Sequence, residues 1–329
     1  MRFRGGACSV RKATFGLALT IISVGTSCGR DSVVKPDPSY AVSACAWPVW
    51  APDGTFIAYS HTPLRRIDYN PKSHSFTYVF CESLTGFYRV YPDGSNEHML
   101  LPTTFRDPDW SADGRYLAYE SRGDIWAAPS SGDSIDVGSA IQLTGSGDSF
   151  SPSWNPSASV VSFSINAGPI AGLYVVPITG GPARLIGSGW SEPDWSPDGT
   201  KFAFVGSVGG QFGIGICDSN GTNAQIVRTS GVRFQFPKWS PDGTRIAFSQ
   251  KVTDGEMPQL WMMVPDGSGA IQLTTSGAEE NFSWSPDGRE IAYVQFNLLS
   301  HEYTNGVLAV RDLVAGSARP LTVNPSCGP

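Results

Sequence analysis

Three of the four histidines could belong to a metal site, because imidazole and carboxylate groups are common protein ligands of zinc and manganese. They are His61, His74 and His301, and Glu302 follows the last of them. No two of these residues show the short spacing of a ligand pair on one helix or strand. The sequence therefore allows a metal site only if the fold brings the two ends of the chain together.

A serine-nucleophile motif also occurs, but its position in the sequence argues against a catalytic role. Residues Gly25 to Gly29, with Ser27 at the centre, fit the G-x-S-x-G pattern of serine hydrolases. In those enzymes the serine sits on a turn between a strand and a helix. Here the motif lies at the end of an apolar run over residues 13–27, which has the character of an export signal. We therefore predict that the chain is not a serine hydrolase, and we find no other catalytic constellation.

The first 27 residues have the composition of a bacterial signal peptide, with four basic residues before the apolar run. The segment that ends in Ser27-Cys28-Gly29 resembles the cleavage box of bacterial lipoproteins, in which a small residue precedes the lipidated cysteine. We predict a signal peptide over residues 1–27, lipidation of Cys28 and a polar linker over residues 28–44. The protein is then expected in the periplasm or at the outer membrane, and secretion is the alternative.

The net charge narrows the class of partner. The chain has 23 basic and 29 acidic residues, and loss of the signal peptide leaves 19 basic residues against the same 29 acidic ones. An acidic surface repels polyanions, so we predict no nucleic-acid partner. Contact with a membrane is expected through the lipid anchor only.

A phrase that ends in tryptophan recurs six times, and it predicts the architecture. Its tryptophans follow one another at intervals of 60, 44, 41, 44 and 45 residues: Trp50, Trp110, Trp154, Trp195, Trp239 and Trp284. A period in the forties with several short strands in each unit is typical of β-propeller blades. The constant position of the tryptophans indicates that they pack between adjacent blades.

The fifth repeat shows the expected strands most clearly. They cover residues 236–240, 245–249, 260–264 and 270–274, with Asp-Gly turns after the first and the third. We find no long segment with a helical apolar period, so the fold class is all-β: a six-bladed β-propeller of four-stranded antiparallel blades over residues 45–329. The third repeat replaces Ser-Pro-Asp-Gly with Asn155-Pro-Ser-Ala158, which predicts a different type of turn there.

The repeated phrase resembles a known family. Pro-x-Trp-Ser-Pro-Asp-Gly followed by Ile-Ala-Phe or Ile-Ala-Tyr, and later by an Asp-Gly turn and Gln-Leu-Thr, is similar to the repeat of the TolB-type propeller, over roughly residues 45–323. The resemblance implies a binding or scaffolding module of the bacterial cell envelope. The α/β domain that precedes the TolB propeller has no counterpart in the about 17 residues between Cys28 and Cys45, so the partnership of TolB with a peptidoglycan-associated lipoprotein is not carried over.

The positions that differ between repeats are where a ligand surface is expected. One variable residue begins the innermost strand of each blade, and these residues should surround the mouth of the central channel: Trp47, Asp107, Ser151, Glu192, Phe236 and Asn281. Two carboxylates together with two aromatic rings suit a protein or peptide segment that carries a basic group. A water-filled channel without a dedicated ligand is the alternative.

A propeller would also bring the histidines near one another. The links between second and third strands should emerge on the face of the channel mouth, with His61 and His74 in the long link of blade 1 and His301 in that of blade 6. A metal-dependent enzyme that acts on envelope saccharides or peptides is therefore the alternative function. Our main prediction is a monomeric, non-enzymatic binding module for a protein or peptide of the envelope, without a metal or another cofactor.

The cysteines suggest a covalent closure of the ring. In the second and fifth repeats the last threonine, Thr144 or Thr274, precedes the next tryptophan by ten residues. Cys327 lies five residues after Thr322, and Cys45 lies five residues before Trp50. The two cysteines therefore meet at one point of the repeat, and we predict a Cys45–Cys327 disulfide between blades 6 and 1. A Cys45–Cys81 bond and the absence of a bond are the alternatives.

Overall fold

The computed structural model describes the repeat region of the chain. The described residues are 43–70, 75–166, 168–251, 258–275, 281–299 and 302–321, and their side chains are described except for 43–44, 64–70, 75–80, 296–299 and 302–306. The predicted signal peptide, most of the predicted linker and Cys28 lie outside these residues.

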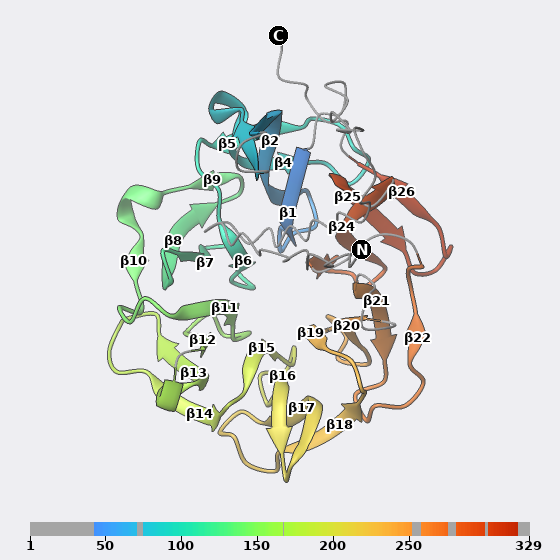
Figure 1. Cartoon of the computed structure of the whole chain (residues 1–329). Coiled ribbons are helices and arrows are strands. Elements are labelled where there is room, and N and C mark those ends of the chain that lie inside the picture. Colours follow the sequence, from blue (N-terminus) through green and yellow to red (C-terminus); the bar gives the residue numbers. More distant parts are fainter. Residues whose placement is uncertain are drawn as a thin grey trace, which may run out of the picture.

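Six blades of antiparallel strands are arranged in a ring, which confirms the six-bladed β-propeller (Figure 1). The inner strands, which border the channel, are β1 (Ser43–Trp50), β6 (Arg106–Trp110), β11 (Ser149–Trp154), β15 (Ser191–Trp195), β19 (Phe234–Trp239) and β23 (Phe282–Trp284). The second strands are β2 (Ile57–Asn70), β7 (Tyr116–Ser121), β12 (Val160–Ile165), β16 (Lys201–Val208), β20 (Ile246–Lys251) and β24 (Glu290–Leu299).

The outer half of each blade completes the four-stranded unit. The third strands are β4 (Gly86–Val90), β8 (Asp124–Ser131), β13 (Gly172–Pro177), β17 (Gln211–Asp218), β21 (Pro258–Met263) and β25 (Glu302–Asp312). The outermost strands are β5 (His98–Leu101), β10 (Ile141–Gln142), β14 (Arg184–Ser188), β18 (Gln225–Thr229), β22 (Ile271–Gln272) and β26 (Ala318–Pro320). Additional short elements are β3 (Ser75–Phe80), β9 (Ser134–Ile135) and the 3-10 helices η1 (Glu82–Leu84), η2 (Val137–Ser139) and η3 (Gly168–Ile170).

The four strands predicted for the fifth repeat are present as β19 to β22, each within a few residues of its expected bounds. None of the helices in the described part of the chain is long or apolar enough to cross a lipid bilayer.

The recurrent Ser-Pro-Asp-Gly phrase forms the turn between the first and second strands. In the fifth blade Gly243 has a φ of 71°, and its N–H donates to the Ser240 carbonyl over 2.9 Å. The Ser240 hydroxyl donates to Asp242 Oδ1 over 2.6 Å and accepts the N–H of Arg245. Glycine suits this turn because a side chain in the left-handed region is strained. The serine and aspartate fix the turn by satisfying its backbone amides.

The turn of the third blade is the same type, so the prediction of a different turn is wrong. Ala158 adopts a φ of 55°, and its N–H donates to the Asn155 carbonyl over 2.9 Å. The side chain of Asn155 replaces the serine and aspartate, because its Oδ1 accepts the N–H groups of Ser159 and Val160. The side-chain amide thus holds an alanine in a conformation that glycine adopts more readily.

The tryptophans pack between neighbouring blades, as predicted. Trp154, only 5% exposed, lies in a cluster with Ala118 and Ile125 of blade 2 and with Val161 and Phe163 of blade 3. The five other interfaces have the same composition, each with one tryptophan of the series and buried side chains from two blades. The core of the molecule is therefore divided into six apolar layers that join the blades in a ring.

Blades 6 and 1 close the ring through backbone pairing and packing. Strand β1 pairs in parallel with β25 at Ala44 and Gly306, which joins the two blades into one sheet. The Arg319 guanidinium donates to Glu290 Oε1 over 2.7 Å and to the Pro92 carbonyl over 3.0 Å, and so links blade 6 to blade 1 at a second point.

The cysteine arrangement differs from the predicted Cys45–Cys327 disulfide. Cys45 carries a thiol, whose Sγ lies 3.5 Å from Nδ1 of His61 on the paired strand β2. Cys81 is disulfide-bonded, but Cys45 is not its partner because Cys45 carries a thiol. The alternative Cys45–Cys81 bond is therefore not formed either. The orientation of Cys45 into the interface between blades 1 and 6 explains the difference, because the buried side chain packs there against apolar neighbours. Cys327 lies outside the described residues.

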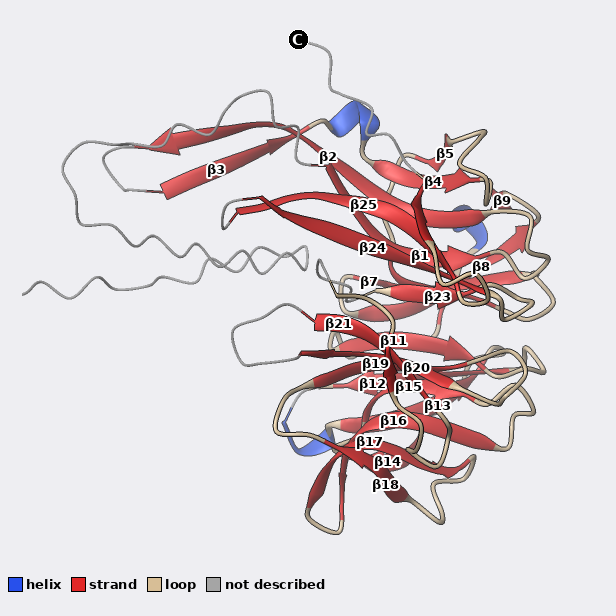
Figure 2. Cartoon of the chain, turned by 90° about the vertical axis from the view of Figure 1, so that its right-hand side faces the viewer, coloured by secondary structure: helices blue, strands red, loops and turns tan. Residues whose placement is uncertain are grey.

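Two long hairpins extend from one face of the disc, on the side from which Figure 1 is viewed. They are the β2–β3 hairpin of blade 1 and the β24–β25 hairpin of blade 6 (Figure 2). Their position agrees with the prediction that links between second and third strands emerge on the face of the channel mouth. This face is called the mouth face below.

Candidate functional site

A bulge in the inner strand positions each residue of the predicted mouth. The pairing register between first and second strands shifts at the mouth residue in blades 1 to 5. At each of these positions the next residue is a proline, which has no N–H to pair with the second strand. The mouth residues adopt left-handed backbone conformations, with φ values between 46° and 54°: Trp47, Asp107, Ser151, Glu192 and Phe236. Bulges and strained residues of this kind are frequent at functional sites because they redirect a side chain.

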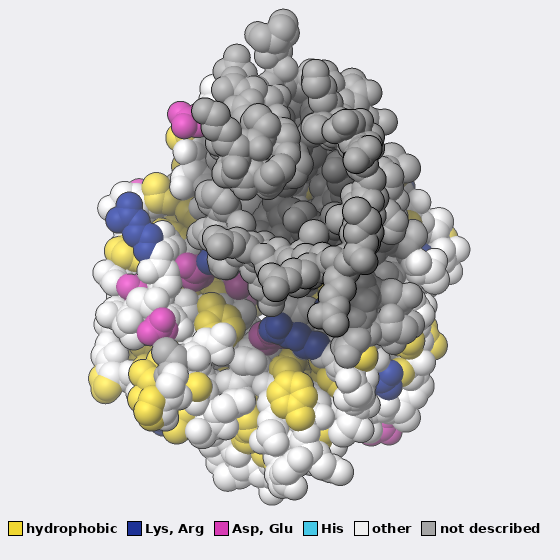
Figure 3. All heavy atoms as spheres, viewed as in Figure 1, with side chains coloured by type: hydrophobic (Ala, Val, Ile, Leu, Met, Phe, Trp, Pro, Cys, Tyr) yellow, Lys and Arg dark blue, Asp and Glu magenta, His cyan; other side chains and the backbone are white. Residues whose placement is uncertain are grey.

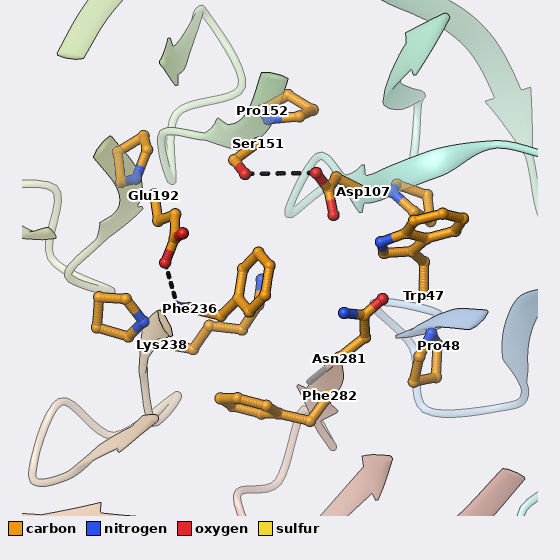
Figure 4. A pocket seen from close by; sticks show the side chains of 13 residues that line it. Trp47, Pro48, Asp107, Ser151, Pro152, Glu192, Phe236, Lys238, Asn281 and Phe282 are labelled. Atoms are coloured by element: carbon orange, nitrogen blue, oxygen red, sulfur yellow. Dashed lines mark hydrogen bonds between the residues drawn. The ribbon is translucent and has the colours of Figure 1, made fainter. Parts of the chain in front are cut away.

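All six predicted mouth residues line one pocket, with an empty volume of about 500 Å³. Figure 4 shows their side chains converging on the channel from six blades. Asn281 differs from the others because a phenylalanine and not a proline follows it. The six residues therefore surround one pocket. Whether the ring binds a ligand stays a prediction.

The two carboxylates of the mouth are held by hydrogen bonds to adjacent blades. Glu192, 8% exposed, accepts the backbone N–H of Phe236 at Oε2 over 2.6 Å. Asp107 accepts the Ser151 hydroxyl at Oδ2 over 3.3 Å (Figure 4). Each carboxylate therefore has a fixed orientation before any ligand arrives, which lowers the entropy lost on binding.

The mouth also contains cations that moderate its negative charge. Burial raises the pKa of Asp107, whereas Arg106 and Lys238 act in the opposite direction on the same carboxyl. The Arg106 guanidinium stands over the Trp47 ring at 5.6 Å from its centroid and lies 3.1 Å from Glu120 Oε2. Lys238 lines the pocket from β19 (Figure 4).

The sequence analysis missed a second set of charged residues, two positions after the mouth residues. These are Asp109, Asp194 and Lys238, the variable residues of the Pro-x-Trp phrase. The signal that identified the mouth, variation between repeats at a fixed position, was therefore present here as well.

The two aspartates of this second set connect neighbouring blades. Asp109 Oδ2 accepts the backbone N–H of Trp154, and Asp194 Oδ2 accepts that of Trp239, each over 2.7 Å. Burial raises the pKa of both carboxyls, that of Asp194 to about 7, and the Lys238 ammonium partly offsets the effect of burial on each. Asp194 is therefore a buried acidic group between blades 4 and 5 whose charge changes near neutral pH.

The histidines do not form a metal site within the described residues. His61 is 1% exposed, and burial lowers its pKa to about 4. Its described surroundings are the Cys45 thiol and the rings of Tyr59 and Tyr88. In the part of the chain that the structure describes, no three His, Cys, Asp or Glu side chains are grouped in a way that could hold a metal ion. His74 and His301 lie outside that part.

Comparison with known proteins places the chain in a family. The sequence profile of the TolB beta propeller domain matches residues 87–310. The protein Atu1656 of Agrobacterium fabrum is 32% identical over 206 residues, which cover 60% of this chain and 67% of that protein.

Solved structures share the fold at lower identity. A TolB-type protein of Agrobacterium tumefaciens is 20% identical with a TM-score of 0.58, covering 86% of this chain and 89% of that one. TolB of Acinetobacter baumannii is 15% identical with a TM-score of 0.58, covering 84% and 78%. An oligogalacturonate lyase in complex with manganese is 13% identical with a TM-score of 0.52, covering 85% and 77%. At these identities the likeness concerns the fold alone, which both binding proteins and enzymes can use. Because the family profile covers more than half of the sequence, the chain belongs to the TolB-type β-propeller family.

Proposed function

We propose that this propeller is a non-enzymatic binding module of the bacterial cell envelope, which receives a cationic protein or peptide segment in its channel mouth. The observation that carries the proposal is the pair Asp107 and Glu192, held in fixed orientations on strained bulges and flanked by Trp47 and Phe236. Carboxylates attract a lysine, an arginine or an amino terminus, and aromatic faces stabilise the same cations. Membership of the TolB-type propeller family supports a binding role at the level of class.

The test is crosslinking and affinity capture from the native envelope with the mature protein, compared with its Asp107→Asn/Glu192→Gln variant. Amide side chains keep oxygen acceptors for the Ser151 hydroxyl and the Phe236 N–H, whereas alanine at position 192 would leave a buried amide without its partner. A matched control is Asp148→Asn/Asp266→Asn, because both carboxylates are exposed and neither lines the pocket. We expect the partner to be lost with the mouth variant and kept with the control.

Export and lipid anchoring are part of the same proposal. They rest on the basic and apolar segments before Cys28 and on the lipoprotein-like box that ends there. Metabolic labelling with a fatty acid should mark the wild-type protein and not a Cys28→Ser variant. A mature periplasmic protein without any label would contradict the lipid anchor and would leave export intact.

A further inference from the structure

A second pocket lies on the mouth face, between blades 4 and 5. It has an empty volume of about 810 Å³ and is bounded by the β16–β17 hairpin on one side and by the link from β18 to β19 on the other. We call it the 4–5 groove; the residues that matter for its chemistry are Glu192, Val205, Phe212, Val232 and Arg233. In Figure 3 this half of the mouth face is open, with hydrophobic and basic side chains beside the centre.

The groove and the channel mouth share a wall. Glu192 lines both pockets, and its carboxylate is fixed by the Phe236 N–H at the entrance to the channel. A chain segment that places a cation at the mouth can therefore continue directly into the groove. This continuity separates the groove from the exposed apolar residues on the outer strands, such as Leu185 and Ile271.

The outer part of the groove combines an apolar surface with a positive charge. Phe212 is 53% exposed at the tip of the β16–β17 hairpin, and Val232 is half-buried in the facing link. Arg233 is exposed, and its guanidinium forms no ion pair with any of the described residues. Aromatic residues, phenylalanine included, and arginine are enriched in protein interfaces relative to the rest of the surface.

We propose that the 4–5 groove holds the part of the same ligand peptide that adjoins its cationic residue. An apolar side chain packs against Phe212 and Val232, and a carboxylate pairs with Arg233. The inference rests on the proposed function and adds a ligand pattern to it: basic, apolar, acidic, in a fixed order from the channel outward. An extended peptide suits this arrangement because its alternate side chains lie on one face.

The experiment is selection from a random dodecapeptide library displayed on phage, with purified mature protein as the immobilised target. The same selection is made with Arg233→Glu. Dissociation constants of enriched peptides are then measured by fluorescence anisotropy for the wild type, for Phe212→Ser/Arg233→Glu and for Asp107→Asn/Glu192→Gln. The matched control is Arg184→Glu/Leu185→Ser, which replaces an exposed arginine and an exposed apolar residue on the outer strand β14 in the same way.

We expect the peptides that are selected on the wild-type protein to contain a basic, an apolar and an acidic residue in one order. The groove variant, Phe212→Ser/Arg233→Glu, should bind these peptides at least about ten-fold more weakly than the wild type does. Selection on Arg233→Glu should replace the acidic residue by a basic one, and the control should bind as the wild type does. Peptides that require Asp107 and Glu192 but bind the groove variant unchanged would overturn the inference and leave the proposed function standing. No enriched peptide, or peptides indifferent to the mouth variant, would contradict the proposed function together with the inference.

Discussion

Single residues control the charge of the channel. Burial raises the pKa of Asp107, Asp109 and Asp194, and the ammonium of Lys238 counteracts this effect on each of them. Among the described residues that line the mouth pocket, Lys238 is the cation, and Arg106 lies beside them over the Trp47 ring. For the proposed cationic ligand, we therefore expect the binding strength to depend on how many of these carboxyls are ionised at a given pH.

The titration of Asp194 should make the free energy of unfolding decrease as the pH rises. Its pKa is about 7 in the folded protein and close to 3.8 when unfolded, so the folded state retains a proton that the unfolded state releases between these values. The contribution of Asp194 to stability is therefore present below about pH 4 and is lost as the pH rises to about 7.

Asp194→Asn should remove this dependence while its amide oxygen still accepts the Trp239 N–H. We expect the melting temperature to fall less between pH 5 and pH 8 in the variant than in the wild type. The exposed Asp148→Asn serves as a control and should keep the wild-type profile. Identical profiles for Asp194→Asn and the wild type would show that the carboxyl titrates normally.

Elements hold the site through contacts that cross from blade to blade. The tryptophan at the end of each inner strand fills the apolar layer between two blades. In three blades the backbone N–H of this tryptophan donates to a side-chain oxygen of the preceding blade. Because the mouth residue lies three positions before that tryptophan on the same strand, the packing also fixes the bulge. The orientation of the mouth thus depends on the interfaces between blades.

Replacement of an interface tryptophan should therefore weaken the whole ring. For Trp154→Ala we expect a loss of about 3–5 kcal/mol in the free energy of unfolding, since the ring is buried between blades 2 and 3. Trp154→Phe keeps much of the packing and should cost roughly half as much or less. Urea denaturation followed by circular dichroism measures both. A loss below about 1 kcal/mol for the alanine variant would contradict the role assigned to the tryptophans.

Local sequence patterns predicted the elements better than the interactions between them. The spacing of the tryptophans and the Asp-Gly turns was enough for the blades, and variation within the repeat located the mouth. The roles of Asp109 and Asp194 depend on amides 45 residues further along the chain, which no local pattern identifies. The conformation of Ala158 likewise depends on the Asn155 side chain, and that of Cys45 depends on packing between the first and last blades.

At the scale of the whole molecule, the blades differ in what they present on the mouth face. Blades 6 and 1 share one continuous sheet and carry the two hairpins that rise from the mouth face. Blades 4 and 5 form the open groove beside Glu192, and blade 4 lies across the ring from blade 1 (Figure 1). The chain of a partner bound in the mouth is therefore expected to continue along the 4–5 groove.

The central claim is that the acidic mouth of the channel recognises a cation on a protein or peptide. Its most direct test is the dissociation constant of the captured partner for the wild type, for Asp107→Asn/Glu192→Gln and for the Asp148→Asn/Asp266→Asn control. Loss of charge-assisted contacts at the mouth should weaken binding at least about ten-fold, with melting temperatures close to the wild type and no change in the control. Equal affinity of all three proteins would contradict the account.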